Sequence, residues 1–193
     1  MTLSTGSLFY EKCDEIAVTS SESGSVHVYT GEGKGKTTAA FGLAMRASGK
    51  GLSVLIIQFL KGRADCGENI SAKRLPGVKV EQYGGEKLVC EGGVTDLDRK
   101  LARDAMKRAQ KAVKSGEVDM LILDEANVAV HFDLITVKEI LGLIDAKPAK
   151  MDLVITGRYA KPEIIERAEY VTEMLAKKHP YDSGRKARPG IES

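Results

Sequence analysis

Beyond about residue 25, short runs rich in apolar residues alternate with segments whose apolar residues recur at helical spacing. The short runs predict strands, at residues 26–29, 52–60, 78–83, 120–123, 153–156 and 170–175. The segments with helical spacing predict helices, at residues 37–48, 96–115, 137–146 and 162–168. Most of the strand runs carry no charge, whereas residues 78–83 alternate polar and apolar positions as an edge strand does. This pattern is typical of an α/β protein, a single domain whose parallel sheet is covered by helices on both faces.

The composition fits one folded domain that follows a short arm. A chain of 193 residues buries roughly 70% of the surface that it exposes when unfolded, which is enough for one core. Residues 1–24 are rich in Ser and Thr and lack apolar periodicity, so we predict a mobile arm that could act as a lid on an active site. The folded domain is then predicted to span residues 25–193.

The net charge and the cysteines of the chain indicate which binding partners and which cellular compartment to expect. The net charge of +2 gives no indication of a nucleic-acid or membrane partner. Cys13, Cys66 and Cys90 are odd in number and lack metal-ligand spacing, which favours free thiols in a reducing compartment. Without an export signal or an apolar run near the ~18 residues that a membrane span needs, we predict a cytoplasmic protein.

A glycine-rich loop joins the first predicted strand to the first helix. Its sequence, TGEGKGKTT at residues 30–38, is in the context in which backbone N–H groups and a helix N-terminus bind phosphate. Lys36 would contact phosphate oxygens, and the Thr37 hydroxyl is placed to ligate Mg²⁺. The usual pattern G-x4-G-K-[ST] requires glycine at the position of Thr30, so this loop is one residue shorter.

Two carboxylates follow the uncharged strand at residues 120–123. If this strand lies next to the first, Asp124 and Glu125 would reach Thr37 and complete a magnesium site. In hydrolysing enzymes the second acid often positions water, a role that would fall to Glu125. A helix N-cap with a solvated neighbour is the alternative interpretation of this acidic pair.

Five separated motifs carry a resemblance to a known family. They are GEGKGKTTAA, VLIIQFLKG, LDEAN, ITGR and KHPYDSGRKARPGIE, and the similarity runs from about Ser25 to Glu192. Together they resemble the ATP:corrinoid adenosyltransferases of the ATP:cob(I)alamin type. The resemblance implies a P-loop RecA-like homodimer that transfers the 5′-deoxyadenosyl group of MgATP to Co(I) of a corrinoid and releases triphosphate. It also implies a reduced flavoprotein as electron donor.

The resemblance also assigns roles to individual residues. Those implied in ATP binding are Gly31, Gly33, Lys34, Gly35, Lys36, Thr37, Thr38, Arg158 and Arg188. Lys36, Thr37 and Glu125 are the implied catalytic residues, and Thr37 and Glu125 would hold Mg²⁺ with help from Asp124. The resemblance also implies that ATP binds in the reverse sense, with its α-phosphate near the place that the γ-phosphate usually takes. In this orientation the ribose C5′ is attacked and the whole triphosphate leaves, a reaction that the shortened loop suits. For Arg158, a structural ion pair is an alternative to phosphate binding.

The corrinoid side of the resemblance is incomplete. Some family members carry an aromatic wedge after the third strand, but residues 84–95 contain no aromatic residue, and the chain has no Trp. The residues that could contact the corrinoid are Phe9, Tyr10, Gln58, Lys61, Glu68, Tyr83 and Leu88. Among these, Gln58, Lys61 and Glu68 could equally contact nucleotide or be ordinary polar residues at strand ends.

Two other functions remain open from the sequence. One is a P-loop ATPase or small-molecule kinase in which Glu125 positions water or acts as a base. The other is a catalytically weak corrinoid carrier that lost the aromatic wedge. The basic C-terminal stretch at residues 177–190 would fold back over the nucleotide in the adenosyltransferase, whereas in other proteins such stretches are usually solvated tails.

Overall fold

One parallel sheet of six strands forms the centre of the molecule. The computed structural model describes residues 23–63, 65–85 and 93–178, together with Gly184, Arg188, Gly190 and Ile191. The strands run in the order β3-β2-β4-β5-β1-β6, and all are parallel. Their bounds are β1 (Val26–Thr30), β2 (Val54–Phe59), β3 (Val78–Tyr83), β4 (Met120–Asp124), β5 (Asp152–Thr156) and β6 (Tyr170–Glu173).

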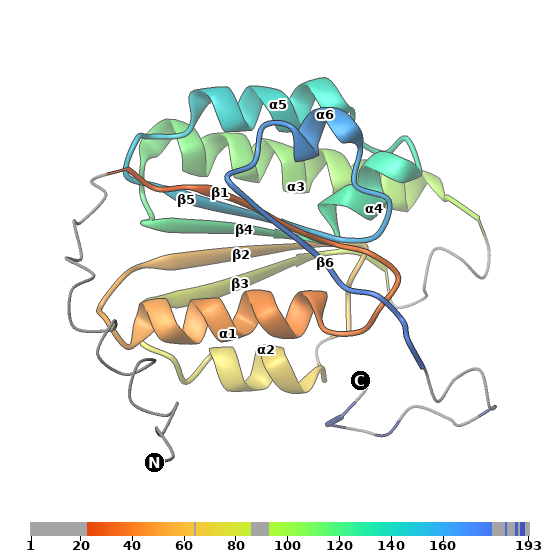
Figure 1. The fold of residues 1–193 in the computed structure, drawn as a ribbon, viewed down its shortest axis with the longest axis horizontal. Coiled ribbons are helices and arrows are strands. Elements are labelled where there is room, and N and C mark those ends of the chain that lie inside the picture. The colour runs from red at the N-terminus through yellow and green to blue at the C-terminus, as the bar shows by residue number, and fades with distance from the viewer. Residues whose placement is uncertain are drawn as a thin grey trace, which may run out of the picture.

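Helices cover both faces of this sheet. Figure 1 shows α1 and α2 on one face and α3, α4, α5 and α6 on the other. The helices are α1 (Lys36–Ser48), α2 (Gly67–Ala72), α3 (Asp96–Ser115), α4 (Ala126–His131), α5 (Val137–Ala146) and α6 (Pro162–Ile165). A single α/β domain with helices on both faces of a parallel sheet is therefore confirmed among the described residues.

The sheet has a core on each face because its central strands are buried on both sides. In β4, Leu121 and Leu123 pack toward α3 and α5, whereas Met120 and Ile122 pack toward α1. Every residue of β2 and β4 is buried. These strands therefore appear in the sequence as continuous apolar runs rather than alternating ones.

Most predicted elements are observed close to their expected bounds. The helices α3 and α5 and the edge strand β3 match the prediction residue for residue. Helix α3 begins at a capping box formed by Thr95 and Asp98 and ends at Gly116, which has a left-handed φ of 62°. The helix expected at residues 162–168 ends at Ile165, and the sequence did not predict α2 and α4. These two have six residues each, too few to show a helical period.

The order of the strands corrects one expectation. The acidic strand β4 does not lie next to β1, because β5 pairs with both of them and separates them. A crossover between parallel strands can skip a position in the sheet, so chain order does not determine which strands are neighbours. As a result, Thr156 at the end of β5 lies beside the acidic pair.

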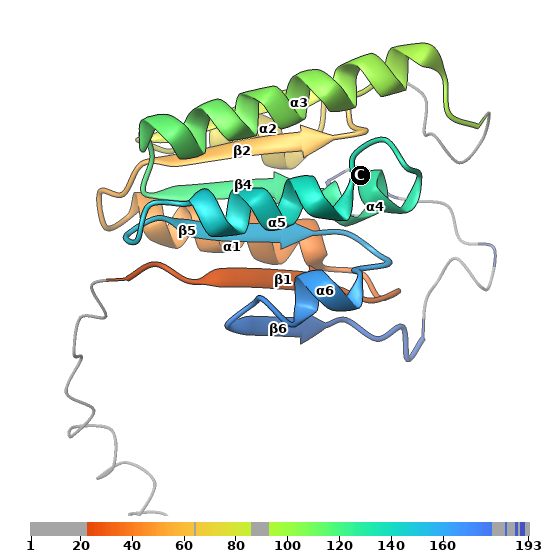
Figure 2. The ribbon, with the colours of Figure 1, turned by 90° about the horizontal axis from the view of Figure 1, so that it is seen from above.

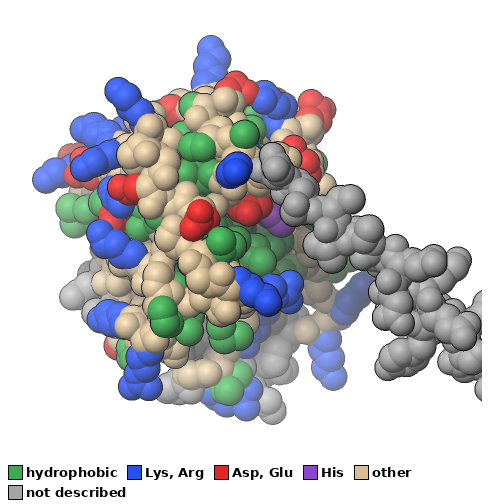
Figure 3. Space-filling view, turned by 90° about the vertical axis from the view of Figure 1, so that its left-hand side faces the viewer, with side chains coloured by type: hydrophobic (Ala, Val, Ile, Leu, Met, Phe, Trp, Pro, Cys, Tyr) green, Lys and Arg blue, Asp and Glu red, His purple; other side chains and the backbone are tan. Residues whose placement is uncertain are grey.

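All strands point in the same direction, so their carboxyl ends share one edge of the sheet (Figure 2). Loops at this edge of a doubly covered sheet are the usual place for a ligand site. Figure 3 shows the opposite end, where basic and acidic side chains are scattered rather than gathered into a stripe of one sign. Within the described part of the chain, no helix combines the length and the hydropathy that crossing a membrane requires.

Candidate active site

The phosphate loop leads directly into α1. Gly35 occupies the N-cap position with φ of 121°, and no side chain caps the helix. The first N–H groups of α1 have no side-chain partner at this cap, and together with the helix dipole they form a site for an anion. The loop therefore has the local geometry that phosphate binding requires.

The glycines of the loop also allow another chain segment to approach. Gly33 N–H donates to the Met174 carbonyl at 2.6 Å, and Met174 N–H donates to the Thr30 carbonyl at 2.9 Å. A Cβ atom built on Gly33 would lie 2.7 Å from the Met174 carbonyl oxygen. Gly31 has φ of 92° and meets the same carbonyl. The segment after β6 thus supports the loop from behind, a contact that the sequence did not reveal.

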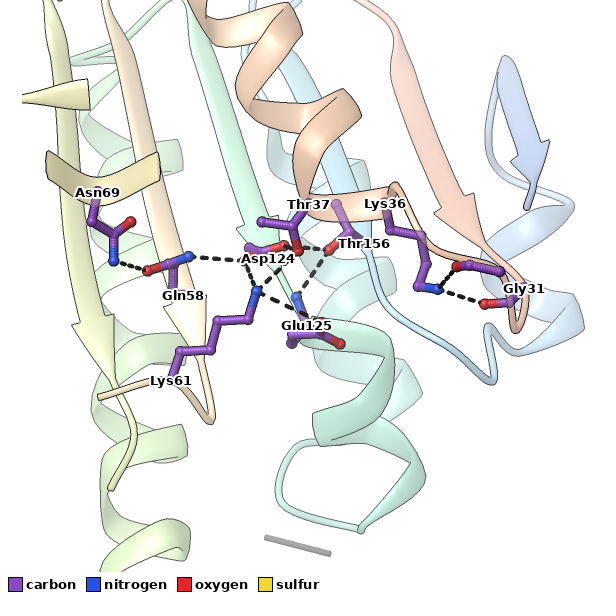
Figure 4. Close-up of polar contacts among 10 residues, drawn as sticks. Gly31, Lys36, Thr37, Gln58, Lys61, Asn69, Asp124, Glu125 and Thr156 are labelled. Atoms are coloured by element: carbon purple, nitrogen blue, oxygen red, sulfur yellow. Dashed lines mark hydrogen bonds and ion pairs between the residues drawn. The ribbon is translucent and has the colours of Figure 1, made fainter. Parts of the chain in front are cut away.

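Lys36 points back into its own loop. Its ammonium donates to the carbonyls of Gly31 at 2.6 Å and Gly33 at 2.8 Å (Figure 4). Burial lowers the pKa of Lys36, and the charge of Glu125 partly opposes this effect. Both of these acceptors are neutral carbonyls. Because an ammonium bonds charged oxygens more strongly than neutral ones, Lys36 is well placed to exchange the carbonyls for phosphate oxygens.

Asp124 is the centre of a second group of polar side chains, drawn in Figure 4. Its Oδ1 accepts from the hydroxyls of Thr156 at 2.7 Å and Thr37 at 3.0 Å. Its Oδ2 accepts from Lys61 Nζ at 2.8 Å and Gln58 Nε2 at 3.0 Å. Burial alone would raise the pKa of Asp124, but the Lys61 charge and these hydrogen bonds lower it. The carboxylate is therefore ionised and has four donors.

Glu125 has a different environment from its neighbour. It adopts a left-handed φ of 61° where β4 turns into α4, and its N–H donates to the Thr156 hydroxyl at 3.0 Å. Glu125 occupies the N-cap position of α4, as the alternative interpretation has it, but its side chain makes no cap hydrogen bond. Burial raises the pKa of Glu125; Lys61 Nζ, at 3.8 Å, opposes this shift, whereas the charge of Asp124 adds to it. Two adjacent acids thus have opposite pKa shifts.

The oxygen atoms of Thr37, Asp124 and Glu125 form a donor set that suits Mg²⁺. Magnesium prefers oxygen ligands and usually takes only one or two carboxylates, with phosphate oxygens and water completing the octahedron. The described residues contain no cluster of three or more His, Cys, Asp or Glu side chains that would suit a metal by itself. The residues therefore fit a magnesium ion that arrives with a polyphosphate.

Comparisons with known proteins establish the family of this chain. The family model of the ATP:corrinoid adenosyltransferase BtuR/CobO/CobP matches residues 22–193. The chain belongs to this family. It is 37% identical over 179 residues to the corrinoid adenosyltransferase of Pseudomonas aeruginosa, covering 93% of this chain and 88% of that protein. It is 35% identical over 189 residues to the enzyme of the same name from Escherichia coli K12, covering 94% and 92% of the two chains.

A solved structure confirms the P-loop RecA-like fold. A KaiC-like protein from the archaeon Pyrococcus horikoshii superposes with a TM-score of 0.51 at 13% identity, covering 81% of this chain and 74% of that one. At this level of identity the likeness concerns the fold only. The family membership predicted from the five motifs and the predicted fold are thus both confirmed.

Within this adenosyltransferase fold, the polar residues at the end of β2 face the acidic pair. Gln58 is fully buried, and its Oε1 accepts from Asn69 Nδ2 at 2.9 Å while its amide donates to Asp124. Lys61 bonds Asp124 and Thr37. Burial alone would lower the pKa of Lys61, but the charges of Asp124 and Glu125, with a smaller effect from Glu68, raise it. The structure places Gln58 and Lys61 on the carboxylate, and their predicted corrinoid contacts remain predictions. Sequence reasoning missed Asn69 and Thr156, although Thr156 lies in the ITGR motif.

Arg158 and a residue near the C-terminus contact the phosphate loop at Glu32 and Lys34. The Arg158 Nε atom is 3.2 Å from Glu32 Oε2, and both side chains are about half exposed. This contact is the ion pair that was the alternative to phosphate binding. Lys34 Nζ donates to the Ile191 carbonyl at 2.6 Å, so the end of the chain returns to the phosphate loop. Arg188 is exposed, and its predicted role in ATP binding remains a prediction.

Tyr83, the aromatic residue nearest the missing wedge, is held by polar contacts. Its hydroxyl donates to Glu81 Oε2 at 3.0 Å, and Arg108 bonds the same carboxylate. Burial, followed by this hydrogen bond, raises the pKa of Tyr83 to about 12. The other aromatic and apolar corrinoid candidates, Phe9, Tyr10 and Leu88, lie outside the described residues.

Proposed function

We propose that this protein transfers the 5′-deoxyadenosyl group of ATP to Co(I) of a corrinoid and releases triphosphate. The observation that carries the proposal is the pairing of a shortened phosphate loop with the Asp124 and Glu125 centre in a member of the adenosyltransferase family. The same-named relatives match over most of their length. The site would supply the positive charge that stabilises a leaving triphosphate.

The reaction requires charge stabilisation rather than a nucleophilic side chain. The electron pair of Co(I) attacks C5′ of the ribose, the cobalt–carbon bond forms, and the bond from C5′ to the triphosphate oxygen breaks. The leaving oxygen retains that electron pair, so negative charge grows on the triphosphate. Lys36 and the first N–H groups of α1 would bind this charge, and preorganised donors of this kind are an effective source of catalysis.

Thr37, Asp124 and Glu125 would hold the magnesium ion. When bound, Mg²⁺ supplies additional charge stabilisation for the leaving triphosphate. Thr156 and Gln58 donate to Asp124 and would keep its carboxylate oriented toward Thr37. Such orientation by surrounding hydrogen bonds is characteristic of metal-binding carboxylates.

A single assay separates this function from its alternatives. The protein is incubated with a chemically reduced Co(I) corrinoid and MgATP, and both the corrin spectrum and the phosphate products are followed. We expect a photolabile alkyl-cobalt product together with triphosphate. Formation of ADP and phosphate without a spectral change would instead identify an ATPase, and binding without any product would identify a corrinoid carrier.

Two variants and one control connect the assay to the site. Lys36→Ala should reduce turnover by about 10²–10³-fold, and Glu125→Gln should change the dependence of the rate on magnesium. Lys107→Met removes an exposed lysine on α3 that pairs only loosely with Asp104, at 3.8 Å, and should leave the rate unchanged. Wild-type rates in both site variants would contradict the assignment.

The proposal includes three finer predictions about the setting of the reaction. A homodimer and a reduced flavoprotein electron donor follow from the family resemblance. A cytoplasmic location follows from the cysteine usage, and Cys66, the cysteine among the described residues, is a free thiol. Size-exclusion chromatography with light scattering tests the dimer, and adenosylation driven by a reduced flavoprotein tests the electron donor.

A further inference from the structure

The Lys61 ammonium lies at the point where the predicted magnesium ligands converge. Its Nζ atom is 2.8 Å from Asp124 Oδ2 and 2.9 Å from Thr37 Oγ1. The nearest oxygen of Glu125 is 3.8 Å away. The side chains that would hold the metal thus all face one lysine ammonium, as Figure 4 shows.

Asp124 and Thr37 already accept hydrogen bonds at the oxygens that a metal ion would use. Asp124 accepts four hydrogen bonds, two at each oxygen, and Thr37 Oγ1 accepts from Lys61 while donating to Asp124. Gln58 and Thr156 are fully buried donors on either side of the carboxylate. Lys61 retains 24% side-chain exposure, so it is the donor that can leave. A metal ion that binds both Asp124 Oδ2 and Thr37 Oγ1 would need the position that this ammonium now holds against the two oxygens.

The backbone at Lys61 is fixed, so the side chain must make the movement. Leu60 N–H donates to the Tyr83 carbonyl at 3.0 Å. A Cβ atom on Gly84 would lie 2.2 Å from Lys61 N, and one on Gly62 would lie 2.2 Å from the Gly84 carbonyl oxygen. This close packing holds the Cα of Lys61 beside the acidic pair. The flexible four-carbon stem of lysine nevertheless allows its ammonium to move.

We propose that Lys61 is a resident cation that occupies the magnesium position in the nucleotide-free protein and is displaced when magnesium-bound triphosphate arrives. This inference rests on the magnesium site of the proposed function. It explains how a fully buried carboxylate is tolerated without a metal, since a buried charge requires a paired partner. It also implies that metal and nucleotide bind together. A metal ion alone would expel the ammonium with no anion to receive it, whereas the triphosphate provides phosphate oxygens for it.

The test measures Mn²⁺ binding in the absence of nucleotide and corrinoid, by the loss of the free-ion electron paramagnetic resonance signal. Lys61→Met retains the length of the side chain but removes its charge. We expect this variant to bind Mn²⁺ at least tenfold more tightly than the wild type. Lys61→Arg retains the charge and should bind Mn²⁺ as weakly as the wild type. Equal affinities for Lys61→Met and the wild type would overturn the proposal.

Controls address charge and folding. Lys107→Met makes the same chemical change on the surface of α3 and should leave Mn²⁺ affinity unchanged; an increase equal to that of Lys61→Met would overturn the proposal. If Lys61→Met folds poorly, Lys61→Gln retains a hydrogen-bond donor without the charge and should also tighten Mn²⁺ binding. The Mn²⁺ measurement is independent of adenosyl transfer, because neither ATP nor corrinoid is present. A wild type that fails to adenosylate therefore contradicts the proposed function while leaving this inference testable.

Discussion

The two halves of the active site are built in different ways. In the phosphate loop, Lys36 bonds carbonyls three and five residues before it in the chain. In the carboxylate centre, Asp124 bonds four residues that lie 32 to 87 positions away, on three other segments of the chain. The first half therefore depends on local backbone geometry, and the second depends on how separate strands meet. Mutations in the two halves should accordingly have different consequences for activity and for stability.

The largest effect on the rate of adenosyl transfer is expected for Lys36→Ala, in the phosphate loop. Within the described part of the chain, the ammonium donates to carbonyls of its own loop, so its loss should reduce adenosyl transfer while leaving the fold intact. Removing a donor that stabilises charge in the transition state typically costs about 10²–10³-fold in rate. The rate is measured from the corrin spectrum, and thermal unfolding is measured alongside. A melting temperature that falls as sharply as the rate would show that the two halves do not differ in this way.

In the carboxylate centre, Thr156→Val should lower the free energy of unfolding. Valine has a similar shape but removes the hydroxyl that donates to Asp124 and accepts from Glu125 N–H. Leaving buried polar groups unpaired costs about 1–3 kcal/mol, which urea unfolding should detect. Thr172→Val, on the exposed strand β6, is the matched control and should change the free energy of unfolding by less than about 0.5 kcal/mol. Equal changes in the free energy of unfolding for Thr156→Val and Thr172→Val would contradict a stabilising role of the Thr156 hydroxyl in the carboxylate centre.

Gly33→Ala tests a long-range support of the phosphate loop, the backbone of Met174. Its methyl group would lie 2.7 Å from the Met174 carbonyl oxygen, so the segment after β6 must shift. Such overpacking typically costs about 1–3 kcal/mol, and ATP affinity should fall because the loop moves with its support. Gly42→Ala is the control, since nothing lies within 4 Å of the position that its methyl group would take in α1, and it should stabilise the protein by about 0.5–1 kcal/mol. Both effects are measured by urea unfolding.

The smallest effect is a pH dependence that separates the two acids. The raised pKa of Glu125 means that the native state holds this proton more tightly than the unfolded chain does. Stability from this group is therefore present below the ordinary pKa of 4.5 and is lost as the pH rises through the native pKa. Glu125→Gln should remove that loss of stability. The melting temperature of the variant, relative to that of the wild type, should therefore rise as the pH increases toward neutral.

Asp124 should show the opposite sign. Its lowered pKa contributes stability above the ordinary value of 3.8, which is lost as the pH falls through the native pKa. Asp124→Asn should therefore lose stability relative to the wild type at neutral pH and recover part of the difference in acid. Melting curves of the metal-free proteins across this pH range test both variants. A parallel course for the two variants would contradict the opposite shifts.

The sequence predicted the fold class, most element bounds and the two chemical motifs. The phosphate loop was recognisable because its glycines, Lys36 and Thr37 are contiguous and act through local geometry. The acidic pair was recognisable because it ends an uncharged strand. The capping box of Thr95 and Asp98 and the left-handed Gly116 show why the bounds of α3 were predicted so closely: the signals that start and stop a helix lie within a few residues of its ends.

Only the tertiary structure decided how these motifs are joined. The position of β5 between β1 and β4 brings Thr156 to Asp124, and the close packing of residues 60–62 against Gly84 brings Lys61 to the same carboxylate. Met174 reaches the phosphate loop from the far end of the chain. These contacts depend on which strands become neighbours, and local apolar periodicity reports which residues are buried but not what they are buried against. The sequence alone therefore determined the chemical groups, and the packing of the sheet determined which of them meet.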